Sequence, residues 1–85
     1  MATLTKAEKA WVAGLNKMLA ECPSKRLGFA TIGDRDVAIY DVTRREDIDA
    51  ELDLGNRDFL PTADRVGALF NEVLNFPNQV ESTAG

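Results

Sequence analysis

The stretch of residues 27–42, LGFATIGDRDVAIYDV, constrains the fold of this 85-residue chain more than any other. Two apolar runs rich in β-branched and aromatic residues flank a polar GDRD corner, which is the pattern of a β-hairpin. One helical pattern precedes the hairpin and another follows it. We therefore predict an α+β fold in which two long helices pack on a small antiparallel sheet.

The register of the hairpin decides which side chains share a face. A turn with Asp34 and Arg35 at its tip pairs Phe29 with Tyr40. One face then carries Ala30, Ile32, Val37 and Ile39, and the other carries Leu27, Phe29, Thr31, Ala38, Tyr40 and Val42. Since both faces are largely apolar, either helices cover both or one is kept for a partner. A slip of one residue would exchange these pairings.

The first helix is predicted over residues 6–21. Thr5 and Glu8 match a capping box, and Pro23 ends the helix. Apolar side chains recur at helical spacing along one side: Ala7, Trp11, Leu15, Met18, Leu19 and Cys22.

Residues 43–54 are compatible with two structures. Thr43 and Glu46 match a second capping box, which favours a short helix near 44–51. The alternation of apolar and acidic residues from Ile48 to Leu54 has the period of a strand, so a third, edge strand is the alternative. Aspartate is depleted in strands, and the helix is therefore preferred.

The last helix is predicted to begin after Thr62, as N-cap, and to end before Pro77. Its stripe consists of Ala63, Val66, Gly67, Leu69, Phe70, Val73 and Leu74. We expect one domain over residues 1–75 and a C-terminal tail over 76–85, which lacks periodicity. The predicted core combines both helices and the hairpin: Trp11, Leu15, Leu19, Ile39, Val66, Phe70 and Val73.

Length and composition indicate a small globular protein. Hydrophobic residues make up 45% of the chain and charged residues 28%, which is typical of a folded domain. No apolar run approaches the roughly 20 residues that span a bilayer, and the N-terminus lacks the apolar core of a secretory signal. The single cysteine fits a reducing compartment. We expect a cytoplasmic protein without membrane contact.

The net charge of −4 is unevenly distributed. Residues 1–26 carry five basic and two acidic side chains, whereas residues 27–85 carry five basic and twelve acidic ones. An acidic surface repels phosphate backbones, so no nucleic-acid partner is expected. The same acidity suits steering toward a basic protein, and the acidic run could imitate nucleic acid there.

The sequence contains no set of residues typical of catalysis. It has no histidine, which removes the commonest general base and metal ligand. Cys22 is interpreted as a small core residue. The spacing of Asp49, Glu51 and Asp53 is similar to that of a calcium loop, but the glycine falls one position late and Leu60 stands where a glutamate is needed. We expect no enzyme activity, no cofactor and no metal site.

Three segments resemble a group of small tailed-phage and prophage proteins: GFATIGDRDVAIYD at 28–41, NRDFLP at 56–61 and NFPNQVESTAG at 75–85. The resemblance covers most of the chain and transfers no catalytic or binding residue. It implies a protein made in the cytoplasm of a bacterial host, and it favours proteins that bind a host factor.

These observations predict a non-enzymatic protein-interaction module. Its candidate surface consists of Leu27, Phe29, Thr31, Tyr40, Asp47, Asp49, Glu51 and Asp53. A structural component that forms a homodimer through the spare apolar face is the alternative. An acidic nucleic-acid mimic that inhibits a basic protein is a third hypothesis.

Overall fold

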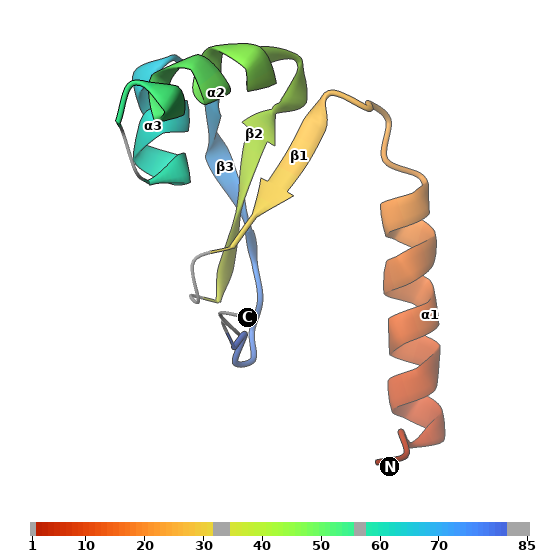
Figure 1. The fold of residues 1–85 in the computed structure, drawn as a ribbon. Coiled ribbons are helices and arrows are strands. Elements are labelled where there is room, and N and C mark those ends of the chain that lie inside the picture. The colour runs from red at the N-terminus through yellow and green to blue at the C-terminus, as the bar shows by residue number, and fades with distance from the viewer. Residues whose placement is uncertain (1, 32–34, 56–57, 82–85) are drawn as a thin grey trace.

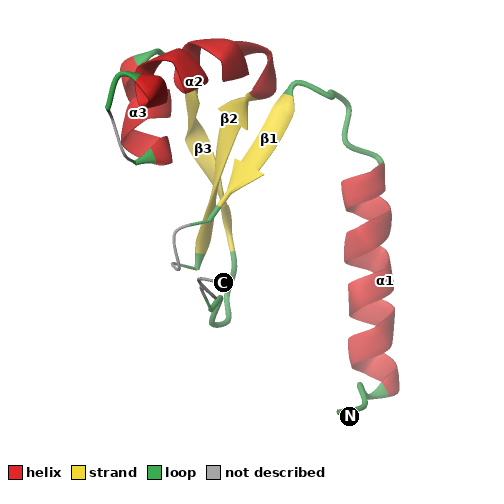
Figure 2. Cartoon of the chain, in the orientation of Figure 1, coloured by secondary structure: helices red, strands yellow, loops and turns green. Residues whose placement is uncertain are grey.

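A computed structural model describes residues 2–31, 35–55 and 58–81. Its elements are α1 (Lys6–Ala20), β1 (Leu27–Ala30), β2 (Asp36–Asp41), the 3-10 helix η1 (Val42–Arg44), α2 (Arg45–Asp53), α3 (Phe59–Arg65) and β3 (Leu69–Asn75) (Figures 1 and 2). The strands form one antiparallel sheet in the order β1-β2-β3. The α+β fold is confirmed.

Helix α1 forms where the sequence predicts it. The Thr5 hydroxyl accepts a hydrogen bond from the backbone N–H of Glu8 at 3.1 Å, and the Glu8 carboxylate accepts one from the backbone N–H of Thr5 at 2.8 Å. These two bonds satisfy N–H groups that have no partner within the helix. Ala20 is the last helical residue, three positions before Pro23.

The hairpin forms, but its predicted register is wrong by one residue. Phe29 lies opposite Ile39, and Gly28 lies opposite Tyr40. A Cβ atom added to Gly28 would lie 2.6 Å from the ring of Tyr40, so this ring occupies the space that the glycine leaves free. Phe29 and Tyr40 therefore lie on opposite faces. The predicted pairing of Ile32 with Val37 is not assessed, because Ile32 lies outside the described residues.

Residues 43–53 are helical, and the alternative of an edge strand is wrong. The predicted cap is also different, because Asp41 rather than Thr43 begins the turn. Its Oδ1 accepts hydrogen bonds from the backbone N–H of Thr43 at 3.0 Å and from the Thr43 hydroxyl at 2.6 Å. Arg44, the N-cap of α2, makes no side-chain cap.

The prediction of one long C-terminal helix is wrong. The chain forms α3, turns at Gly67 and continues as β3, which pairs with β2. Gly67 has a φ of 77°, a value that ends helices and favours glycine. Thr62 is not the N-cap but a buried residue within α3, whose hydroxyl donates a hydrogen bond to the carbonyl of Asp58 at 2.6 Å.

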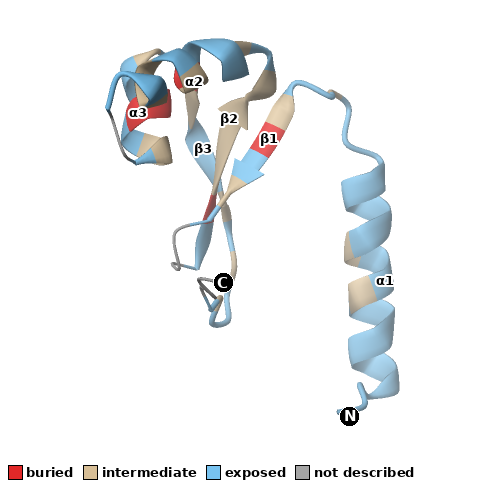
Figure 3. Cartoon of the chain, in the orientation of Figure 1, coloured by how far each residue is buried: buried red, intermediate tan, exposed pale blue. Residues whose placement is uncertain are grey.

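The core lies at the end of the sheet that α2 and α3 cover (Figures 1 and 3). Ile48, Ala63 and Ala68 are its fully buried members. Partly buried side chains surround them: Tyr40, Leu52, Phe59, Val66 and Leu69. The predicted core is wrong for Trp11, Leu19 and Val73, which are exposed, and correct for Val66, which packs against the buried cluster.

Helix α1 stands beside the sheet and does not lie on it (Figure 1). In the part of the chain that the structure describes, no helix has the length and apolar character needed to cross a membrane.

Candidate interaction surface

The apolar side of α1 is a surface of the molecule. No residue of α1 is buried, and the exposed fractions of Trp11, Met18 and Leu19 are 60%, 72% and 50% (Figure 3). Leu15, between them on the same side, is half-buried. We call these four residues the α1 stripe. Helices of small domains normally bury such a stripe against the core, so its exposure makes it a candidate for a binding surface.

Among the residues that the structure describes, no helix covers the sheet face opposite to Tyr40, although Val37 at the centre of that face is only 8% exposed. The observed register places Leu27, Phe29 and Ile39 on the face opposite to Tyr40. Helices α2 and α3 pack on the Tyr40 side, whose ring contacts Phe59 edge-on at 5.0 Å between centroids. Phe29 is 48% exposed. Leu74 lies on the same face, because it is paired with Val37, two residues before Ile39. We call Leu27, Phe29, Ile39 and Leu74 the open sheet face.

A groove separates α1 from the end of β3. Its larger part has a volume of about 670 Å³ and runs along α1 from Leu4 to Leu15, opposite residues 76–79. A second part of about 240 Å³ lies between the α1 stripe and residues 74–77. Trp11 and Leu15 border both parts. The groove is thus lined by apolar side chains on both walls and could accommodate side chains of another molecule.

The structure divides the predicted apolar candidates among three places. Leu27 and Phe29 lie on the open sheet face. Tyr40 belongs to the opposite face and packs in the core. Thr31 is exposed and lines a separate hollow of about 350 Å³ next to Phe59. These residues therefore do not form one patch.

The predicted acidic candidates lie on α2 and point to two sides of it. Asp47 and Glu51 share one side, and Asp49 and Asp53 share the other, because residues four apart stack on a helix. Ion pairs join Asp47 to Arg44 at 2.6 Å, Asp49 to Arg45 at 2.9 Å and Glu51 to Arg65 at 3.8 Å. This distribution differs from the continuous negative stripe of a nucleic-acid mimic.

Arg45 links the acidic helix to the aromatic core. Its guanidinium carbon lies 5.0 Å from the ring centroid of Phe59, a cation–π contact. The carboxylate of Asp49, and after it the hydroxyl of Tyr40, raises the pKa of Arg45. Arg45 and Asp49 thus have a structural role in holding α2 on the core.

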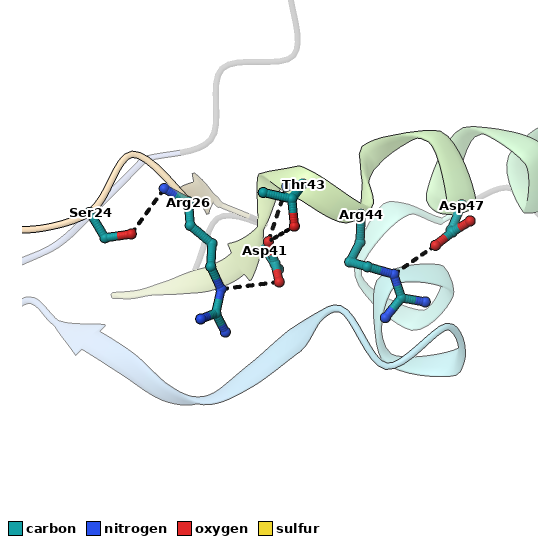
Figure 4. A network of polar contacts seen from close by, with 6 residues as sticks. All are labelled: Ser24, Arg26, Asp41, Thr43, Arg44 and Asp47. Carbon is teal, nitrogen blue, oxygen red and sulfur yellow. Dashed lines mark hydrogen bonds and ion pairs between the residues drawn. The ribbon is translucent and has the colours of Figure 1, made fainter.

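A polar network lies at the start of β1, where the segment that follows α1 joins the sheet (Figure 4). Arg26 Nε donates to Asp41 Oδ2 at 3.1 Å, and the Arg26 guanidinium carbon lies 4.9 Å from the ring centroid of Phe70. The hydroxyl of Thr43, more than Arg26, holds the pKa of Asp41 below its usual range. The start of β1, the end of β2 and the start of β3 are therefore tied together.

Cys22 lies on the surface, two residues after the end of α1. Cys22 is exposed, contrary to the prediction of a core residue, and its thiol donates to the carbonyl of Ser24 at 3.3 Å. Groups of three or more side chains suited to holding a metal ion are not found in the ranges that the structure describes.

Trp11, Leu15 and Leu19 of the α1 stripe were predicted as core residues, and Met18 as part of the apolar side of the same helix, but none of the four as a site residue. The sequence carries no signal that separates the two roles, since a packed helix and an unpacked one show the same apolar periodicity. Only the arrangement of α1 beside the sheet distinguishes them.

The chain was compared with models of protein families, with curated proteins and with solved structures, and none of them matches it.

Proposed function

We propose that this protein is a non-enzymatic protein-interaction module that binds through the α1 stripe, the open sheet face and the groove beside them. The exposure of Trp11, Met18 and Leu19 carries the proposal. Three large apolar side chains on one helix side cost free energy in water, and a protein partner would remove that cost. The proposed setting is the cytoplasm of a bacterial host, as the resemblance to phage proteins implies.

Two further features support a binding role for this surface. The capping box satisfies the backbone N–H groups at the start of α1 and so favours presentation of the stripe on a regular helix. Aromatic residues and methionine are enriched at the centres of protein interfaces, and both are present in the stripe.

The proposal is tested by whether the α1 stripe packs on the sheet of its own chain or stays available to another molecule. We expect the purified protein to be either an oligomer with Trp11 protected from acrylamide quenching or a monomer with Trp11 accessible to it. A monomer in which Trp11 is protected would show that α1 closes on its own sheet, and it would contradict the proposal. Since Trp11 is the only tryptophan, its fluorescence reports on this surface alone.

A further inference from the structure

We propose that the occupant of this surface is a second copy of the same chain, with α1 of each copy packed on the open sheet face of the other. This inference rests on the proposed function and names its partner. Each chain contributes one apolar helix side and one apolar sheet face on which Phe29 is exposed and no described helix packs, which are the two halves of a helix-on-sheet layer.

The exposed surface area of the chain is the first argument for a second copy. The chain exposes 6940 Å², whereas a compact monomer of 9.3 kDa exposes about 5,000 Å². The excess of about 2,000 Å² per chain lies within the range that obligate homodimers bury per subunit.

The extension of the chain agrees with this excess. The radius of gyration is 15.6 Å, whereas a compact domain of this length has about 12 Å. Helix α1 causes much of the extension, because it stands apart from the sheet and reaches past the end of the strands that is remote from α2 and α3 (Figure 1). An element that protrudes from its own domain and buries no residue there is suited to exchange between copies.

The charge of α1 favours its packing on the sheet of the other copy over its packing on α1 of the other copy. Residues 1–26 have five basic and two acidic side chains, and the remainder has five basic and twelve acidic ones. Helix α1 carries three lysines and one glutamate, whereas the three strands carry two aspartates, one glutamate and no basic side chain, so packing α1 on the sheet of the other copy brings a positive element to a negative one. Packing α1 against α1 would bring two positive segments together, which like-charge repulsion disfavours.

Reciprocal exchange also gives a closed assembly. If α1 of the first copy lies on the sheet of the second, two-fold symmetry places α1 of the second on the sheet of the first. The α1 stripe and the open sheet face of both copies are then covered, so neither surface is left for a third copy. A dimer is therefore the expected state, with both Trp11 side chains buried in it.

The test combines the molar mass with Trp11 fluorescence. We expect sedimentation equilibrium to give twice 9.3 kDa for the unmodified chain. Met18→Glu, on the α1 stripe, and Phe29→Glu, on the open sheet face, should each weaken dimerisation at least about tenfold, because each places a charge in an apolar contact. Both side chains are exposed within one chain, so neither change removes a core contact.

The matched control is Leu54→Glu. Leu54 is 79% exposed at the end of α2, away from the proposed contact. We expect this variant to dimerise like the unmodified chain. An equal loss of dimer in Leu54→Glu would show that added charge alone opposes association and would overturn the assignment of the surface.

Mixing the two weakened variants tests the exchange itself. A mixed pair combines the intact α1 of Phe29→Glu with the intact sheet face of Met18→Glu, so one of its two contacts is undamaged. We therefore expect dimer to reappear on mixing. Unchanged dimerisation of Phe29→Glu alone would indicate pairing of α1 with α1 and would overturn the exchange.

The mass of the unmodified chain separates this inference from the proposed function. A monomer at all concentrations overturns the inference. If Trp11 is then accessible to acrylamide, the interaction surface stands and belongs to a different partner; if Trp11 is protected, both proposals fail.

Discussion

Gly28 and Tyr40 set the register of the sheet at the scale of single residues. The Tyr40 ring lies over Gly28, and its edge contact with Phe59 connects the sheet to α3. A side chain at position 28 would meet Val42 Cγ1 at 2.5 Å and the Tyr40 ring at 2.6 Å. The glycine is therefore required by space and not by a positive φ.

Gly28→Ala is expected to destabilise the protein by about 1–3 kcal/mol, because the added methyl group overpacks this contact. The matched control is Gly14→Ala in α1, where nothing lies within 4 Å of the new Cβ. This variant should gain roughly 0.5–1 kcal/mol from helix propensity. Chemical denaturation measures the free energy of unfolding of both variants. An unchanged free energy of unfolding in Gly28→Ala would contradict the register.

The depressed pKa of Asp41 predicts a loss of stability in acid. The folded protein holds this pKa below its value in the unfolded chain, chiefly through the Thr43 hydroxyl. The contribution is therefore complete above the unfolded-state pKa and disappears as the pH falls through the folded-state pKa.

Asp41→Asn should accordingly flatten the decline of the unfolding midpoint between neutral and acidic pH. Thr43→Val removes the hydroxyl and keeps the backbone N–H bond to Asp41, so we expect it to flatten the decline only in part. If the midpoints of Asp41→Asn and the unmodified chain decline equally with pH, Asp41 is not the responsible group.

At the scale of elements, the sequence predicts some parts well because the signals are local. The Thr5–Glu8 capping box and Pro23 lie within a few residues of the helix ends that they determine, and α1 follows them. The helical interpretation of residues 44–51 was correct for a similar reason, since the low strand propensity of aspartate is a local property.

The C-terminal third shows why other parts were not predicted. Leu69, Phe70, Val73 and Leu74 fit a helical stripe, but β2 needs a hydrogen-bonding partner on its free edge, and β3 supplies it. The unpaired edge of β2 is a property of the sheet and cannot be read from the sequence of residues 69–75. Gly67 was a local signal for the end of α3, but it was interpreted as part of the stripe.

Helix α1 is expected to lose structure when the proposed dimer dissociates. An isolated helix of 15 residues is marginal in water, and α1 buries no residue in its own domain. Dilution should therefore lower the helical circular dichroism signal together with the dimer fraction, and Thr5→Ala, at a cost of about 1 kcal/mol, should increase this loss. Helicity that is independent of concentration would contradict the coupling.

At the scale of the whole molecule, the chain combines a small core with a large exposed apolar surface. Ile48, Ala63 and Ala68 hold α2 and α3 on one end of the sheet, while the α1 stripe and the open sheet face stay outside that core. The candidate site could be predicted only in part. The hairpin pattern indicated a spare apolar face, but its membership depended on a register that the loop sequence did not determine.

The central claim is that α1 of one copy lies on the sheet of another. It is tested most directly by nuclear Overhauser effects between Trp11 and Phe29 in a mixture of isotope-labelled and unlabelled chains, filtered for contacts between different copies. The account predicts intermolecular cross-peaks between the two rings. Cross-peaks that arise only within one copy would contradict it.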